Sequence, residues 1–180
     1  MISGPSGAGK GTLVTRVRER RSNLGLTVSA TTRAPRKGEV DGVNYFFLTR
    51  EEFDRRVANG EFAEWAEVHG NCYGTLVSEV QSKLASGSSL ILEIDVQGAL
   101  QVKERFPEAV LIFIKPPSLE VLRERLVGRG TETPETIELR MANAADELAL
   151  ADRYDDVVVN DDLDRATDEL VRVLDMHERI

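Results

Sequence analysis

Cysteine, histidine and long apolar runs are all scarce in this chain of 180 residues. The single cysteine, Cys72, has no partner for an internal disulfide, which favours a reducing compartment. No apolar stretch approaches the roughly 20 residues that a membrane-spanning helix needs. No basic and then apolar export leader precedes the glycine-rich stretch that starts at Gly4. The histidines, His69 and His177, lack metal-ligand spacing. We therefore expect a cytoplasmic protein with no membrane partner and no metal site built by protein ligands alone.

Positive charge is also in short supply, with 23 Lys and Arg against 31 Asp and Glu, for a net charge of −8. A general nucleic-acid binder usually carries a basic surface, so we expect no nucleic-acid partner. Hydrophobic residues at 41% and charged residues at 30% are typical of a globular domain. The chain contains no internal repeat and no Pro/Ser-rich linker. The sequence therefore predicts one domain, and it leaves open whether that domain is a monomer or a homo-oligomer.

Short apolar runs alternate with helical stretches, which predicts an α/β fold with a parallel sheet core. The expected strands are 26–30, 89–95, 109–115 and 156–160. The expected helices are 10–22, 97–106, 118–127, 134–151 and 163–178. Ser118 and Thr133 are candidate N-caps, and Pro134 suits a first helical position. Only three residues precede Gly4, fewer than the usual five or six of a strand. We expect that the natural first strand has more residues.

The segment from 31 to 80 interrupts this alternation and predicts a small mixed insert on the parallel core. Thr49 and Glu52 form a capping-box pattern that opens a helix. After Gly60, the stretch EFAEWAEVHGNCYGT predicts strands joined by a turn at Gly70-Asn71. A second irregular stretch at 128–135, GRGTETPE, predicts a mobile flap between two helices.

The stretch GPSGAGKGT, from Gly4 to Thr12, nearly matches the phosphate-binding pattern G-x-x-x-x-G-K-[ST]. In that pattern, backbone amides and the start of the following helix face phosphate oxygens, and the lysine adds a positive charge. Gly11 stands where the pattern has a metal-facing hydroxyl, and Thr12 follows one place late. Mg²⁺ tolerates few protein ligands, so we interpret the site as modified and expect phosphates, water and Thr12 to hold the ion.

Two further stretches contain groups suited to a nucleotide. SATTRAPRKGEVDGVNY, residues 29–45, gathers Arg33, Arg36 and Lys37 in one loop, and Arg presents paired donors to phosphate oxygens. A solvated basic loop explains that stretch equally well. In the expected strand after Gly60, Glu64 points to the opposite face from Glu61 and Glu67. The residues alone leave open whether Glu64 pairs with an arginine or binds a ligand, and they favour the ion pair.

Carboxylates and arginines recur near the ends of other core elements. The strand LILEID ends in Asp95, as a Walker-B strand does, with Glu93 two residues earlier on the same face. Arg125 and Arg129 are four residues apart and share a helix face if the helix continues through Gly128. Together with Arg140 they predict a cationic lid over a polyphosphate, whereas Arg123 is interpreted as part of a plain cationic helix face.

Taken together, these motifs resemble those of the guanylate kinase family over essentially the whole chain. GPSGAGK, SATTRAPRKGEVDGVNY, EFAEWAEVHGNCYGT, LEIDVQG, IFIKPPSLEVLRERLVGRGTET and VVVNDDLD follow the family's order. The resemblance implies a P-loop NTPase-type parallel sheet core flanked by helices, with a small mixed α/β GMP-binding lobe and a helical lid. The implied boundaries are 1–28, 80–115 and 156–180 for the core, 29–79 for the lobe and about 116–155 for the lid.

The resemblance also implies roles for individual residues. The groups around the transferring phosphoryl are Lys10, Arg125, Arg129 and Arg140. The ATP-binding residues are Gly4, Pro5, Ser6, Gly7, Ala8, Gly9, Lys10, Gly11, Thr12 and Asn160. The GMP-binding residues are Ser29, Glu64, Thr75 and Asp95 at the base and Arg33, Arg36, Tyr45 and Tyr73 at the phosphate.

The implied activity is phosphorylation of GMP, and of dGMP, by ATP that carries Mg²⁺. Guanine presents N–H donors along one edge, which suit the acceptor-only carboxylate of Glu64. Two alternatives stay open at this point. One is a non-catalytic protein-binding module of the same family, against which Lys10 and the lid arginines argue. The other is a kinase for another nucleoside monophosphate such as AMP, which a carboxylate at the base disfavours.

Overall fold

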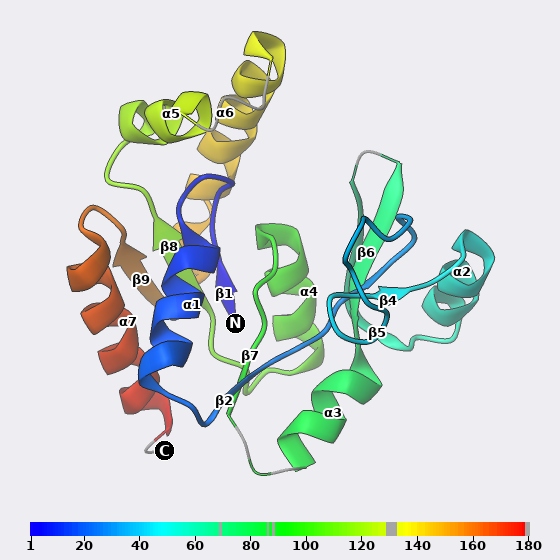
Figure 1. The fold of residues 1–180 in the computed structure, drawn as a ribbon. Helices are drawn as coiled ribbons and strands as arrows, with labels where there is room; N and C mark the ends of the chain where they lie inside the picture. Colours follow the sequence, from blue (N-terminus) through cyan, green and yellow to red (C-terminus); the bar gives the residue numbers. More distant parts are fainter. Residues whose placement is uncertain (69, 86, 88, 129–132, 179–180) are drawn as a thin grey trace. The chain divides into compact units, whose positions relative to one another are not determined.

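The computed structural model describes residues 1–68, 70–85, 87, 89–128 and 133–178 (Figure 1). These residues form an α/β fold with parallel strands and two compact units. Unit 1 comprises residues 1–22, 93–96 and 109–180, and unit 2 comprises residues 23–92 and 97–108. The α/β class with a parallel sheet expected from the sequence is confirmed, and the division into core, lobe and lid stays a prediction.

Unit 1 is built on a parallel sheet of β1 (Ile2–Ser3), β8 (Ile112–Lys115) and β9 (Asp156–Val159), in the order β1-β8-β9. Ile2 pairs with Ile112, which in turn pairs with Asp156. The side chains of Ile112, Phe113 and Ile114 are all almost completely buried. Burial on both faces explains why β8 is a continuous apolar run rather than an alternating one.

Helices α1 (Lys10–Arg20) and α7 (Leu163–Glu178) lie side by side in unit 1 (Figure 1). The residues that α1 and α7 bury are mainly apolar, and they include Leu13, Val17 and Leu170. Charged residues pair between the two helices at their exposed sides: Arg16–Asp164, Arg20–Asp168, Arg21–Asp175 and Arg21–Glu178. Surface pairs of this kind add little energy each, so the buried apolar residues hold α7 in place.

Helices α5 (Leu119–Gly128) and α6 (Pro134–Leu148) pack on each other through a small apolar cluster of Leu122, Leu126, Ala144 and Met141. Both helices begin as the sequence predicts. The Ser118 hydroxyl accepts a hydrogen bond from the Val121 amide at 3.2 Å, and the Thr133 hydroxyl accepts one from the Thr136 amide at 3.3 Å. These caps satisfy amides that the first helical turn leaves without a partner.

Unit 2 contains a parallel pair, β2 (Leu24–Leu26) with β7 (Ser89–Ile91), and a four-stranded sheet. The sheet has the order β4-β3-β6-β5, with bounds β3 Ala30–Thr31, β4 Phe46–Phe47, β5 Phe62–Val68 and β6 Asn71–Leu76. The helices are α2 (Arg50–Ala58), α3 (Val77–Ala85) and most of α4 (Val96–Arg105).

A separate apolar cluster fills the mixed part of unit 2. Phe53 of α2 stacks on Phe62 of β5 with ring centroids 4.3 Å apart. Cys72 and Leu76 of β6 belong to the same cluster and are buried. The predicted mixed insert therefore has its own core, which supports the β5–β6 hairpin independently of unit 1.

Several predicted elements have wrong bounds, among them the strand expected at 109–115, which begins at Ile112. The single strand expected at 26–30 is two strands, because β2 pairs with β7 whereas β3 pairs with β4 and β6. The strand expected at 89–95 ends at Ile91, and Glu93 forms an isolated bridge with Ile2 because the pairing partner changes. The helix expected at 134–151 ends at Leu148, and a separate 3₁₀ turn covers Ala151–Arg153.

The start of α2 combines a cap with an ion-pair cluster. The Thr49 hydroxyl accepts from the Glu52 amide at 3.1 Å. The Glu52 carboxylate accepts from Arg55 and Arg56 at 2.7–2.9 Å. Hydrogen bonds from Arg55 and then Arg56 lower the pKa of Glu52 to about 2.

We predict a pH-dependent loss of stability for Glu52→Gln. A carboxylate whose folded pKa is lowered stabilises the fold above its unfolded value of 4.5 and loses that contribution as the pH falls toward about 2. The variant should therefore melt below the wild type at pH 7, and the gap should close in acid. Thermal unfolding followed by circular dichroism measures this. Glu51→Gln, in the same helical turn, is the control, and a gap that widens in acid would contradict the prediction.

Candidate functional site

The glycine-rich stretch links β1 to α1, and Gly9 is the N-cap of that helix. Gly9 has φ 91° and ψ 19°, in the left-handed region, and Gly7 has φ 92°. This conformation turns the chain directly into Lys10, the first residue of α1. Amides at a helix start lack intrahelical partners and carry partial positive charge, so this segment has the backbone of an anion-binding loop.

Two positions of the loop have to be glycine, because neighbouring atoms leave no room for a Cβ. A Cβ on Gly4 would overlap the carbonyl oxygen of Ile114 in β8, where φ at Gly4 is +141°. A Cβ on Gly9 would overlap the side-chain nitrogen of Asn160. At these two glycines, the backbone of the loop therefore lies in direct contact with Ile114 and Asn160 at the end of the sheet. The sequence pattern places the glycines, and these contacts show why no other residue fits there.

Three cations contact oxygen atoms of the loop. The Lys10 ammonium donates to the carbonyl of Gly4 at 2.5 Å and to that of Pro5 at 3.1 Å. Arg140 of α6 donates to the Ser6 hydroxyl at 2.6 Å. Arg125 of α5 donates to the Ala8 carbonyl at 3.4 Å. The predicted catalytic residues Lys10, Arg125 and Arg140 thus meet at one loop, whereas Arg129 lies outside the described residues.

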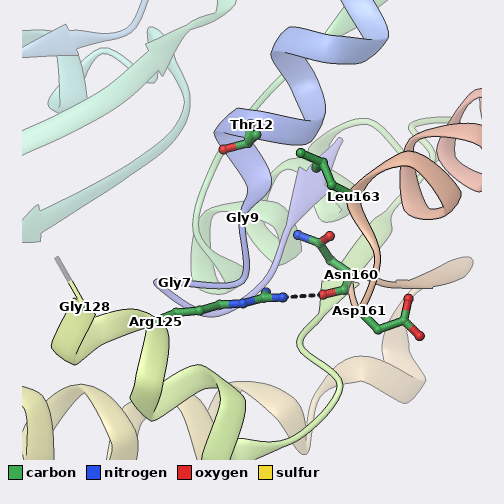
Figure 2. Close-up of a pocket in the computed structure, with 8 residues that line it drawn as sticks. All are labelled: Gly7, Gly9, Thr12, Arg125, Gly128, Asn160, Asp161 and Leu163. Atoms are coloured by element: carbon green, nitrogen blue, oxygen red, sulfur yellow. Dashed lines mark hydrogen bonds between the residues drawn. The ribbon is translucent and has the colours of Figure 1, made fainter.

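Asn160 joins the end of β9 to the same loop. Its side-chain amide is buried and donates to the Ala8 carbonyl at 2.8 Å. The backbone carbonyl of Asn160 accepts a hydrogen bond from Arg125 at 2.7 Å (Figure 2). Asn160 therefore fixes both the loop and an arginine of α5, which is a positioning role that the sequence did not reveal.

A pocket of about 450 Å³ opens beside the loop within unit 1 (Figure 2). Its volume is in the range of small-molecule sites. The lining residues come from the loop, α1, α5 and the β9–α7 connection: Gly7, Gly9, Thr12, Arg125, Gly128, Asn160, Asp161 and Leu163. Asp161 and Leu163 were not predicted as site residues. Their position could have indicated them, because both follow shortly after Asn160, at the carboxyl end of a parallel strand, where ligands of open α/β sheets bind.

Two carboxylates of unit 1, Glu93 and Glu147, interact electrostatically with Lys10. Desolvation by protein atoms raises the pKa of Glu93, and the positive charge of Lys10 partly offsets it. Desolvation also raises the pKa of Glu147 in α6, where Lys10 acts to lower it and Asp95 to raise it. Glu93 and Asp95 are exposed and alternate with the buried Leu92, Ile94 and Val96. The same-face placement of Glu93 and Asp95 predicted from the sequence agrees with this burial pattern.

The predicted base-contacting residues of unit 2 include a buried polar pair. Glu64 of β5 is opposite Thr75 of β6 in the sheet register, and the Thr75 hydroxyl donates to the Glu64 carboxylate at 2.6 Å. Both residues are buried, Glu64 with 6% of its surface exposed. The contact with Thr75 is a hydrogen bond from a neutral donor, whereas the residues alone had favoured an ion pair.

The predicted phosphate-contacting residues gather around Arg33. Its guanidinium donates to both carboxylate oxygens of Glu39, at 2.9 and 3.0 Å, and lies 5.4 Å from the Tyr45 ring centroid. Tyr45 and Tyr73 form an edge-to-face pair with centroids 6.2 Å apart. The hydrogen bond from Arg33, followed by one from the Arg36 amide, lowers the pKa of Glu39. Glu39 is thus a partner of Arg33 that sequence reasoning missed.

The remaining predicted residues are less tightly gathered. Arg36 is exposed, and its backbone amide donates to Glu39 at 2.6 Å. Ser29 is half-buried, and its carbonyl accepts from the Phe46 amide at 2.9 Å. Asp95 belongs to unit 1, whereas the other predicted base and phosphate residues for GMP belong to unit 2.

The described residues offer neither a metal-binding cluster of side chains nor a membrane-spanning helix. They contain no cluster of three or more His, Cys, Asp or Glu side chains placed to hold a metal ion. Within the same residues, every helix is too short or too polar to cross a membrane.

Comparison with known proteins gives one consistent family. The family model for guanylate kinase matches residues 1–177. A guanylate kinase from Gloeobacter violaceus is 56% identical, over 97% of this chain and 85% of the relative. One from Halalkalibacterium halodurans is 53% identical with the same coverage. A crystal structure of guanylate kinase from Anaplasma phagocytophilum superposes with a TM-score of 0.74 at 38% identity, over 97% of this chain and 82% of that one.

We predict that Asn160→Asp destabilises the protein. The substitution keeps the side-chain size but replaces the donor to Ala8 with a carboxylate oxygen, so two acceptors face each other. An unpaired buried group costs about 1–3 kcal/mol, and we expect a loss of that size at pH 8. The loss should shrink as the pH falls, because a protonated carboxyl can donate again. Asp161→Asn, at the next position, is the control. Chemical denaturation measures the effect, and equal stability at pH 8 would refute the assigned contact.

Proposed function

The chain belongs to the guanylate kinase family and phosphorylates GMP with ATP, and on that premise we propose that the phosphate loop of unit 1 binds ATP and the Arg33 and Glu64 clusters of unit 2 bind GMP. The observation that carries the proposal is the meeting of Lys10, Arg125 and Arg140 at a loop that caps a helix. The alternative of a non-catalytic binding module is not favoured, because these cations and the loop are all in place.

The phosphate loop, nearby cations and a pocket of unit 1 act on ATP in this proposal. The loop amides and the start of α1 bind the phosphates, and Lys10 exchanges its contacts with loop carbonyls for phosphate oxygens. Arg125 and Arg140 stabilise the charge that spreads over the transferring phosphoryl. Arg129 is assigned the same role on sequence alone. The pocket beside Asn160 and Leu163 accommodates the adenosine part of ATP.

Recognition of guanine rests on the Glu64–Thr75 pair. An ionised carboxylate accepts from the N1–H and N2–H₂ groups of guanine, and a hydroxyl fixes its orientation by donating to one oxygen. Adenine has an acceptor at N1, so it would leave the buried carboxylate facing a lone pair. Sites built around such hydrogen bonds reject mismatched ligands by about 10⁴-fold. Ser29 and Asp95 complete the assigned base contacts.

Arg33, Arg36, Tyr45 and Tyr73 bind the GMP phosphate in this proposal. Arg33 already holds its guanidinium in a two-point contact with the Glu39 carboxylate, and a phosphate presents oxygens in a similar geometry. The contacts assigned to GMP from the family resemblance are all with its base or its phosphate. We therefore include dGMP among the substrates.

The reaction needs no general base. A GMP phosphate oxygen is the nucleophile, and with a second pKa of about 6 it is mostly ionised at neutral pH. The protein has to hold two polyanions in line and offset their repulsion. Mg²⁺ bound to ATP would further screen the phosphate charge. The residues fit such an ion, because Thr12 and Glu93 place hard oxygen donors on unit 1, at the start of α1 and beside β1. We assign the protein to the cytoplasm, where the lone thiol of Cys72 stays reduced.

We predict that Lys10→Met disables transfer but not GMP binding. Loss of one fixed donor at a developing charge typically lowers kcat by about 10²–10³-fold. A coupled ADP-release assay measures kcat, and calorimetry measures the Kd for GMP, which should not change. Lys115→Met, an exposed lysine of the same unit, is the control. Full activity of Lys10→Met would refute the role given to the loop.

We predict that Glu64→Gln weakens discrimination between purines. The variant replaces one carboxylate oxygen with a donor, so guanine loses a charge-assisted hydrogen bond worth about 1.5–3 kcal/mol, or roughly 10–100-fold in kcat/KM. Activity with AMP should change less, and the GMP-to-AMP ratio should narrow. Glu67→Gln, in the same strand but half exposed, is the matched control. If Glu64→Gln retains the wild-type preference, Glu64 does not recognise the base.

A further inference from the structure

The strand that carries Glu64 lies at the edge of its sheet. β5 is the last strand in the order β4-β3-β6-β5, so β6 pairs with only one of its two sides. Backbone groups on the other side of an edge strand are left without a strand partner. The register with β6 also shifts between Phe62 and Glu64, as it does at a β-bulge. Because a bulge re-aims the side chains beside it, the direction of Glu64 depends on how this part of β5 is held.

Two side chains of α4 take the place of a neighbouring strand. The side-chain oxygen of Gln101 accepts a hydrogen bond from the Trp65 amide at 3.2 Å, and its side-chain nitrogen donates to the Trp65 carbonyl at 3.3 Å. A residue of a paired strand exchanges the same two bonds with its neighbour. Arg105 donates to the carbonyls of Phe62 and Gly60 at 2.7 and 2.8 Å. Gln101 and Arg105 are four residues apart, so they lie on one face of α4.

These contacts enclose Glu64 along the chain. Trp65 directly follows Glu64, and Phe62 lies two residues before it, on the other side of the register shift. Three successive residues, Phe62, Ala63 and Glu64, are buried, in place of the alternation of a regular strand. A change in the backbone on either side would therefore turn the Glu64 carboxylate, which accepts from Thr75 across the hairpin.

We propose that Gln101 and Arg105 are positioning residues for base recognition: by pairing with the backbone on either side of Glu64, they fix the direction in which its carboxylate meets guanine. The inference rests on the proposed role of Glu64 in binding the base. Both residues act through β5 rather than on the substrate. Hydrogen bonds are directional, so a small displacement of the acceptor is enough to weaken its contact with the base.

Steady-state kinetics with GMP and with AMP, at saturating ATP, test the pair. Gln101→Ala should lower kcat/KM for GMP about 10-fold, mainly through a higher KM, because a displaced carboxylate meets the base in a poorer geometry. The value for AMP should change less, so the GMP-to-AMP ratio should narrow. Arg105→Ala should act in the same direction, and Arg105→Lys should recover part of the loss, since an ammonium also donates to carbonyls. Glu104→Ala, at an exposed position of the same helix, is the control and should leave the ratio unchanged.

Two further measurements separate positioning from a general loss of stability. Hydrogen exchange of the Trp65 amide, followed by NMR, should be faster in Gln101→Ala, and unchanged exchange would show that the contact is not made. In the Glu64→Gln background, Gln101→Ala should change the GMP-to-AMP ratio little further, because both residues act on one contact. A structural weakening that does not involve Glu64 would add its full effect instead.

The inference is wrong if either Gln101→Ala or Arg105→Ala retains the wild-type GMP-to-AMP ratio. It is also wrong if the two monophosphates lose kcat/KM equally, or if the effects of Gln101→Ala and Glu64→Gln are additive, since each result would indicate a purely structural role. A wild-type preference in Glu64→Gln itself would refute the proposed role of Glu64, on which the inference depends.

Discussion

The close approach of the phosphate loop to the end of the parallel sheet constrains everything else in unit 1. The loop runs so near Ile114 and Asn160 that residues 4 and 9 have no room for a side chain. Loop carbonyls and the Ser6 hydroxyl are thereby available to Lys10, Arg125 and Arg140, and three cations gather at one short segment. Charge is concentrated because the backbone is compact there, and a looser loop would separate the cations.

In the β5–β6 hairpin of unit 2, close packing likewise leaves a glycine with no room for a side chain. Gly74 lies in the middle of β6, where a Cβ would be 2.7 Å from the Glu64 carbonyl and 2.8 Å from the Phe62 ring. The strands β5 and β6 pack closely at this glycine, and the Glu64–Thr75 pair beside it is buried. Buried polar groups are usually hydrogen-bonded, and the Thr75 hydroxyl is one donor to this carboxylate.

The sequence predicted those features that depend on local pattern or on a long motif. Helix starts at Ser118 and Thr133, the turn at Gly70 and the burial of β8 all follow from short-range rules and agree with the structure. Features set by distant partners were missed. The change of partner between β2 and β3, and Asn160 holding Ala8 across the fold, depend on which strands meet, and periodicity does not contain that information.

The two sets of cations differ in what they must give up when a phosphate binds. Lys10, Arg125 and Arg140 donate to neutral oxygens of the loop, which are weaker acceptors than a phosphate. Arg33 donates to the Glu39 carboxylate, so a phosphate there replaces one anion with another. On the proposed assignments, Arg33 has to exchange a carboxylate for a phosphate, whereas the loop contacts given above are with neutral oxygens, and we propose that Tyr45 and Tyr73 add donors beside Arg33. This asymmetry suits a transfer in which the donor's phosphates carry more charge than the acceptor's single phosphate.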